Sequence, residues 1–148
     1  MRPPDELVEQ FRRNGLKATP QRVAVFRALH GDLTHPTAEA VHARVVADLP
    51  TVSLRTVYQV LGDLAEMGEI LHLDLGTGSG RFDPRVEAPH HHVVCTSCGM
   101  VRDLEGGPAL LHTADLPAGF TPHSTEVTVR GLCAGCAAAV RREGPVRP

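Results

Sequence analysis

The fold of this chain is organised by one stretch, His90-His91-His92-Val93-Val94-Cys95-Thr96-Ser97-Cys98. Three histidines lead directly into a Cys-x-x-Cys pair, and the other two cysteines, Cys133 and Cys136, repeat the same spacing. Two such pairs can close a tetrahedral zinc site, and neighbouring imidazoles can hold a second metal ion. We therefore expect two kinds of metal site in the C-terminal part of the chain.

The cysteines predict a structural site. Each pair is expected on a tight turn at a strand end, where backbone N–H groups stabilise thiolate charge. Four sulfurs leave a tetrahedral ion no open position, and binding then contributes folding free energy. Two disulfides or a redox dithiol are the alternatives, but zinc is favoured because one arrangement uses every cysteine. The predicted zinc ligands are Cys95, Cys98, Cys133 and Cys136.

Length and charge limit what the chain can be. Its 148 residues suffice for one ordinary domain or two small ones, and small ones need a metal or a dimer interface for stability. With a formal net charge of −2, any nucleic-acid binding must come from a local cationic face. The sequence has no membrane-length apolar run and no signal-peptide pattern, so we expect a cytoplasmic protein in a reducing environment.

Amphipathic segments precede the histidines. Apolar residues recur at helical spacing in each segment, and glycine or proline follows each one. Thr19 and Ser53 are predicted N-caps, and Pro20 suits a first helical position. We expect helices close to residues 5–14, 20–30, 37–49 and 53–67.

The fourth of these helices has a polarity that suits DNA. One side carries a buried apolar stripe, while the other changes from cationic and hydroxyl-bearing residues in its first turns to Asp63 and Glu66 in its last. A recognition helix that enters the major groove by its N-terminus requires this order. A plain helical domain is the alternative, which the Arg-Thr-x-Tyr-Gln start disfavours. The predicted groove-facing residues are Arg55, Thr56, Tyr58 and Gln59.

A hairpin is predicted next, with strands at residues 70–75 and from 81 onward around a glycine-rich tip. Helices followed by a hairpin indicate a winged helix-turn-helix domain over residues 1–83. Residues 84–89 contain two prolines and no periodicity, which indicates a hinge.

Residues 90–148 predict a small α/β domain. Its expected elements are a strand through His92 to Cys95, a short helix through Leu110 and Leu111, a strand over 124–132 and a final helix over 134–142. The fold class of the whole chain is therefore predicted as α+β.

From about Leu7 to Cys136 the chain resembles the ferric uptake regulator family and, within it, the peroxide-responsive repressors. The motifs that carry this resemblance are Thr19-Pro20-Gln21-Arg22, His35-Pro36-Thr37-Ala38-Glu39, Thr56-Val57-Tyr58, Arg81-Phe82-Asp83, His90 to Cys98-Gly99, and Gly131-Leu132-Cys133-x-x-Cys136.

The resemblance implies a homodimeric, metal-dependent repressor that binds a palindromic operator, with its C-terminal domain serving dimerisation. In this reading Lys17 and Arg22 contact phosphate, which positions the protein without specifying sequence. The family's regulatory metal site falls on His35, Asp83, His90, His92 and Asp103. Such nitrogen and oxygen donors suit Fe²⁺ or Mn²⁺.

Some positions of this chain differ from the patterns of particular groups within the family, and these differences indicate which signal the protein senses. The chain has no fifth cysteine of the kind that zinc-responsive relatives use, and Ala88 stands where nickel-responsive relatives carry a ligand. The carboxylate at Asp103, together with Asp83, favours peroxide sensing. A manganese or iron uptake regulator without peroxide sensing is the alternative. An enzyme is not expected, because the chain has no nucleophile motif and no cofactor-binding glycine pattern.

Overall fold

The structure is a computed structural model that describes residues 1–105 and 116–143. The chain divides into two compact units, Met1–Glu87 and Ala88–Pro148. Their boundary falls within the segment predicted as a hinge. Within the described ranges, no helix is both long and apolar enough to cross a membrane.

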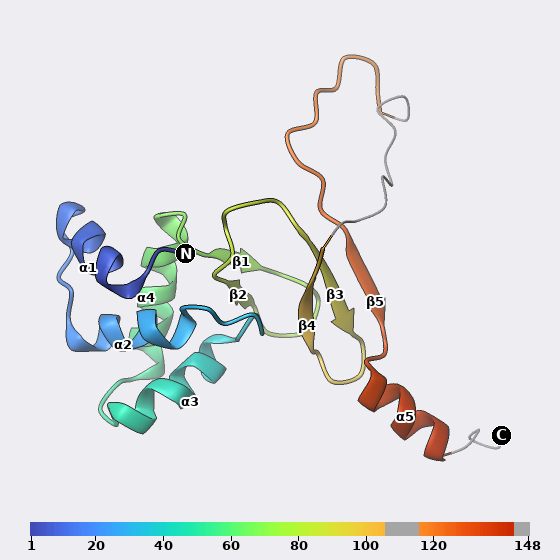
Figure 1. The fold of residues 1–148 in the computed structure, drawn as a ribbon, viewed down its shortest axis with the longest axis horizontal. Coiled ribbons are helices and arrows are strands. Elements are labelled where there is room, and N and C mark those ends of the chain that lie inside the picture. The colour runs from blue at the N-terminus through green and yellow to red at the C-terminus, as the bar shows by residue number, and fades with distance from the viewer. Residues whose placement is uncertain (106–115, 144–148) are drawn as a thin grey trace. The chain divides into compact units, whose positions relative to one another are not determined.

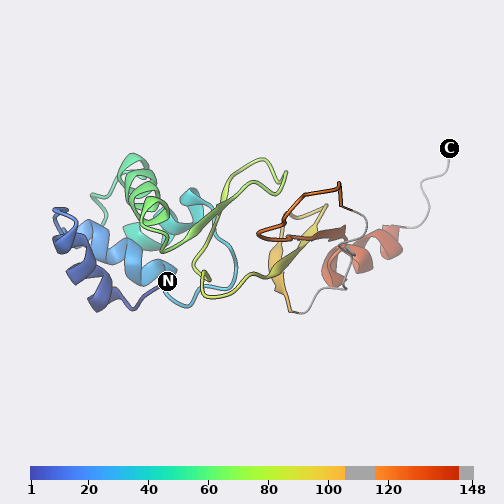
Figure 2. The ribbon, with the colours of Figure 1, turned by 90° about the horizontal axis from the view of Figure 1, so that it is seen from above.

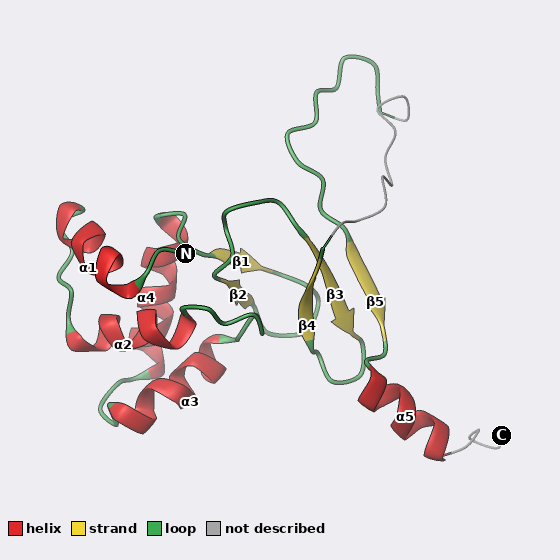
Figure 3. Ribbon diagram, viewed as in Figure 1, coloured by secondary structure: helices red, strands yellow, loops and turns green. Residues whose placement is uncertain are grey.

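The first unit begins with helices that start where the sequence places their caps. Thr19 Oγ1 accepts a hydrogen bond from the Arg22 N–H, and Ser53 Oγ accepts one from the Thr56 N–H. Thr37 caps the third helix in the same way through the Ala40 N–H, so that helix begins one residue later than predicted. The helices, drawn in Figure 1 and Figure 3, are α1 (Pro4–Arg13), α2 (Pro20–Leu29), α3 (Ala38–Asp48) and α4 (Leu54–Glu66).

Glycine ends two of these helices. Gly15 and Gly68 have φ angles of 72° and 69°, a left-handed conformation that a side chain disfavours. After α4, the Glu69 N–H reaches back to the Leu64 carbonyl and the Gly68 N–H to the Ala65 carbonyl. These bonds satisfy the carbonyls at the end of the helix and fix where the following strand begins.

The core of the first unit packs one face of each helix. Phe11 of α1 and Phe26 of α2 have ring centroids 4.8 Å apart, and both are fully buried. The predicted stripe of α4 supplies Val57, Leu61 and Leu64, which are also fully buried. This packing presents the opposite side of α4, with its polar first turns, to solvent.

The hairpin is a short wing. Strand β1 (Leu71–Leu73) pairs antiparallel with β2 (Arg81–Asp83), so His72 lies opposite Phe82. The paired part is shorter than the predicted strand over 70–75. Ile70 is buried in the helical core, whereas His72 stacks on Phe82 at 5.1 Å between ring centroids.

The second unit is a three-stranded sheet in the order β4-β3-β5, labelled in Figure 1. It is followed by α5 (Ala134–Glu143), the red helix in Figure 2. Strand β3 (His91–Cys95) pairs antiparallel with β4 (Val101–Leu104) and parallel with β5 (Thr128–Gly131). β5 is shorter than the predicted strand over 124–132, because its ladder partner β3 starts only at His91. The predicted helix through Leu110 and Leu111 lies outside the described residues.

Arg22 has an intramolecular role that sequence analysis missed. Its Nη2 lies 2.7 Å from Asp63 Oδ2 on α4, and its Nη1 donates to the Lys17 carbonyl at 2.7 Å. The guanidinium carbon also lies 5.3 Å from the centroid of the Phe11 ring. Arg22 therefore ties α2 to α4, while its predicted phosphate contact stays a prediction.

This pair should contribute measurably to stability. In a double-mutant cycle with Arg22→Met and Asp63→Asn, we expect a coupling energy of about 1–2 kcal/mol, because the pair is largely shielded from water. The matched control is the exposed Glu9–Arg12 pair, for which we expect about 0.5 kcal/mol or less. Urea unfolding followed by circular dichroism measures both, and equal couplings would contradict the assignment.

Candidate metal centres

Four thiols converge in the second unit. Their sulfur atoms all lie within 4.8 Å of one another. Cys95 ends β3 and Cys98 lies in the turn that follows, while Cys133 precedes α5 and Cys136 lies in its first turn. The parallel pairing of β3 with β5 brings the two Cys-x-x-Cys turns together, with Cys95 opposite Gly131.

The charge environment of this cluster favours a cation. Backbone N–H groups of Cys133, Cys98 and Ser97 point at Cys95 and lower the pKa of its thiol to about 6. The Ser97 hydroxyl lowers the pKa of Cys136, but the three other thiols outweigh it and raise that pKa to about 11. Backbone N–H groups thus favour the thiolate at Cys95, and four converging sulfurs suit a divalent cation. The cysteines are free of disulfides and form a structural zinc site, as predicted.

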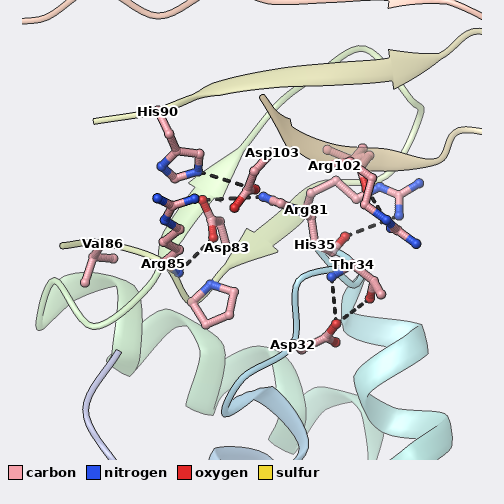
Figure 4. A network of polar contacts seen from close by, with 12 residues as sticks. Asp32, Thr34, His35, Arg81, Asp83, Arg85, Val86, His90, Arg102 and Asp103 are labelled. Carbon is pink, nitrogen blue, oxygen red and sulfur yellow. Dashed lines mark hydrogen bonds and ion pairs between the residues drawn. The ribbon is translucent and has the colours of Figure 1, made fainter. Parts of the chain in front are cut away.

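A second donor pair lies in the first unit. His35 is in the loop between α2 and α3, and Asp83 ends β2. The His35 Nε2 and Asp83 Oδ2 atoms are 3.5 Å apart, and both side chains are 1% exposed. The other carboxylate oxygen, Oδ1, accepts the Arg85 N–H at 2.8 Å, which fixes the rotation of the carboxylate. Figure 4 shows these side chains from close by.

A third donor group lies at one end of the sheet in the second unit. His92 on β3 is opposite Asp103 on β4, and His90 immediately precedes β3. The His90 and His92 ring centroids are 4.8 Å apart. His90 Nε2 lies 3.6 Å from Asp103 Oδ1, and Figure 4 shows these two side chains facing each other. Alternate residues of a strand share a face, so His90 and His92 lie on the same side, and the pairing of β3 with β4 brings Asp103 beside them.

Neighbouring contacts orient these histidines. His90 Nδ1 lies 3.1 Å from the Ala88 carbonyl, which can only accept, so Nδ1 carries the proton and Nε2 presents a lone pair. His91 lies on the other face of β3, where its Nδ1 accepts the Val127 N–H at 3.3 Å. His90 thus has the tautomer of a metal ligand, whereas His91 ties the sheet to the segment before β5.

The residues predicted to contact DNA have different surroundings. Arg55, Gln59 and Lys17 are exposed, and the Tyr58 side chain is 49% exposed. The Tyr58 hydroxyl donates to Glu39 Oε1 of α3 at 2.8 Å, which lowers the pKa of Glu39 and raises the pKa of Tyr58. Thr56, which is less exposed, has its hydroxyl 2.9 Å from that of Ser53.

The zinc site should be required for the second unit to fold. We expect Cys98→Ser to lose the bound zinc, about one ion per chain, and with it the protease resistance of residues beyond the unit boundary. Ser97→Ala keeps every sulfur and should keep the zinc. Metal analysis and limited proteolysis measure both effects. A zinc-free Cys98→Ser protein with a protease-resistant second unit would show that the metal is dispensable.

Known proteins resemble this chain along most of its length. The model of the ferric uptake regulator family matches residues 13–129. The peroxide-responsive repressor PerR of Staphylococcus saprophyticus is 32% identical over 138 residues, which cover 89% of this chain and 90% of that protein. The peroxide operon regulator of Bacillus subtilis is 32% identical over 134 residues, which cover 88% and 91%.

Solved structures share the fold of this chain. The Helicobacter pylori ferric uptake regulator superposes with a TM-score of 0.75 at 21% identity, covering 90% of each chain. The Campylobacter jejuni peroxide stress regulator superposes with a TM-score of 0.64 at 30% identity, covering 88% of this chain and 98% of that one. This chain therefore belongs to the ferric uptake regulator family.

Proposed function

We propose that a single Fe²⁺ or Mn²⁺ ion takes ligands from both units and thereby controls operator binding. The chain is a metal-dependent transcriptional repressor of the peroxide-responsive kind, and it acts as a homodimer on double-stranded DNA. Zinc is its structural metal, and Fe²⁺ or Mn²⁺ is its regulatory metal. The proposed regulatory ligands are His35 and Asp83 from the first unit and His90, His92 and Asp103 from the second.

The observation that carries this proposal is how the donors are divided. The first unit supplies one imidazole and one carboxylate, and the second supplies two imidazoles and one carboxylate. Mn²⁺ prefers about six hard ligands, and a donor set without sulfur discriminates against softer metals. Since neither group alone completes such a sphere, an ion that uses both is held best when the units are held together.

Holding the units together affects DNA binding through the dimer. A dimeric reader must set its two recognition helices at the spacing of the operator half-sites. Val129 of β5 and Val140 of α5 in the second unit are 46% and 55% exposed, and burial of such side chains against a partner subunit would stabilise a dimer. If the dimer is built on this unit, the regulatory ion selects the placement of α4 that fits the operator.

Peroxide sensing would reverse this state. When bound, Fe²⁺ would supply the redox chemistry that activates peroxide, which Mn²⁺ does not supply. The histidine ligands His35 and His90 are the residues that would gain one oxygen atom from peroxide, with the second oxygen released as water. An oxidised imidazole no longer offers the same lone pair, so one unit loses a ligand. The ion then no longer favours the placement of the recognition helices that fits the operator.

His35→Ala should abolish metal-dependent operator binding. We expect Mn²⁺ to tighten the binding of wild-type protein to a family-type palindrome by more than about tenfold, and to have no effect on the variant. The exposed His30→Ala is the matched control and should behave as wild type. Fluorescence anisotropy measures the affinities, and metal analysis should find zinc retained. Mn²⁺-dependent binding by His35→Ala would refute the ligand assignment.

The peroxide response is tested by comparing two metals. The Fe²⁺-loaded dimer should release the operator on addition of stoichiometric peroxide, and the Mn²⁺-loaded dimer should remain bound. Peptide mass analysis should then find one added oxygen on His35 or His90 in the iron sample alone. Retention of DNA by both forms, without added oxygen, would favour an uptake regulator that does not sense peroxide.

A further inference from the structure

Consecutive residues of β2 hold the loop that carries His35. The Arg81 Nη1 atom donates to the His35 carbonyl at 3.3 Å, and the Phe82 N–H donates to the Pro36 carbonyl at 3.0 Å. The Asp83 carboxylate then faces the His35 imidazole. These contacts with β2 hold the His35–Pro36 loop in place, and Figure 4 shows Arg81 beside this loop.

The backbone conformation of His35 depends on contacts of this kind. Its φ angle is 50°, and it is the one residue other than glycine with a positive φ within the described part of the chain. Non-glycine residues adopt this left-handed conformation rarely, and it persists where surrounding contacts over-determine it. A guanidinium bond to the His35 carbonyl fixes the following peptide plane. Arg81 therefore helps to set the direction in which the imidazole points.

The same guanidinium also reaches the wing tip, which we define as residues 74–80. Arg81 Nε donates to Thr77 Oγ1 at 3.4 Å, and the Thr77 hydroxyl donates to the Ser79 carbonyl at 3.3 Å. At the base of the tip, a side chain at Gly80 would collide with the His72 ring, which packs against that backbone. One side chain, Arg81, thus contacts both the wing tip and the backbone of His35.

We propose that Arg81 is a positioning residue that couples the regulatory metal to the wing. Its planar guanidinium bonds both the Thr77 hydroxyl and the His35 carbonyl. A change in the conformation of the wing tip therefore changes the conformation of His35. This inference rests on the proposed function, since it assumes that His35 binds the regulatory ion. By linkage, an ion that favours this arrangement orders the tip, and an ordered tip raises affinity for the ion. The order of the wing tip then depends on whether the regulatory ion is bound to His35 in the same unit.

Two substitutions test the coupling without changing the charge near the ion. Arg81→Lys keeps the positive charge, but a single ammonium cannot replace the fork that contacts both acceptors. Thr77→Val removes the tip acceptor at nearly constant size, while Thr77→Ser retains the hydroxyl and serves as the matched control. Ser79→Ala is a second control, because the Thr77 hydroxyl bonds the Ser79 backbone and not its side chain.

The first readout is Mn²⁺ affinity of the zinc-loaded dimer, titrated through the electron paramagnetic resonance signal of free Mn²⁺. We expect Arg81→Lys to weaken binding by about tenfold and Thr77→Val by about threefold. Thr77→Ser and Ser79→Ala should match wild type, and the urea midpoint of each variant should be unchanged. Equal affinities for wild type, Arg81→Lys and Thr77→Val would overturn the inference.

A parallel His35→Ala titration separates this inference from the proposed function. If His35→Ala loses the site while Arg81→Lys and Thr77→Val bind as wild type does, the proposed function stands and the coupling is wrong. If His35→Ala binds Mn²⁺ as wild type does, the proposed function fails and the inference fails with it.

The second readout is hydrogen exchange in the wing tip. Mn²⁺ should slow amide exchange in residues 76–80 of the wild-type protein by about threefold or more, and should have little effect on Arg81→Lys at saturating Mn²⁺. Thr77→Ser should retain the metal-dependent protection. Protection of the tip that is the same in wild type and Arg81→Lys would overturn the coupling, because the tip would then sense the metal by another route.

Discussion

A regulatory ion can act as a switch in this protein because its proposed ligands are divided between two separately folded units. An ion that meets only one imidazole and one carboxylate binds weakly, and one that meets the full set binds tightly. That difference in affinity is the free energy available to shift the units between arrangements. A shift from a 1:99 to a 99:1 population needs a preference of about 10⁴-fold, which added nitrogen and oxygen ligands can supply. Oxidation of one ligand would lower this difference in affinity, and with it the free energy available to shift the units.

The two units are stabilised by different means. In the first, side chains from all four helices and the wing form one apolar core. In the second, the buried apolar side chains among the described residues are Val94, Cys95 and Val101, too few for an independent core of ordinary stability. The zinc site compensates by joining the turn after β3 to the start of α5. We therefore expect zinc to keep the sheet intact, so that His92 and Asp103 stay opposite each other whether or not the regulatory site is filled.

Local signals made much of this predictable. Helix starts followed from Thr19 and Ser53, and the alternation of side chains along a strand placed His90 and His92 on one face. The cysteine spacing indicated the zinc site before any contact was known. These predictions depend on neighbours in sequence, where the backbone geometry is nearly fixed.

Contacts between distant segments were not predictable in the same way. Arg22 was expected to contact phosphate, yet its guanidinium bonds Asp63 of α4, a choice that depends on how α2 and α4 pack. The left-handed backbone of His35 carries no signal in composition or periodicity. The strand over 124–132 proved shorter because a strand extends only as far as its ladder partner. The hinge role of residues 84–89 stays a prediction.

The most direct test of this account asks whether one ion is bound by histidines of both units. Electron–nuclear double resonance on Mn²⁺-loaded protein with ¹⁵N-labelled histidine counts the coordinated imidazoles. The account predicts three nitrogen couplings in the wild-type protein and two in each of His35→Ala and His92→Ala. Three couplings in His35→Ala would mean that His35 is not a ligand. Two couplings in both wild type and His35→Ala would mean that His90 and His92 of the second unit hold the ion without His35, and either result would contradict the account.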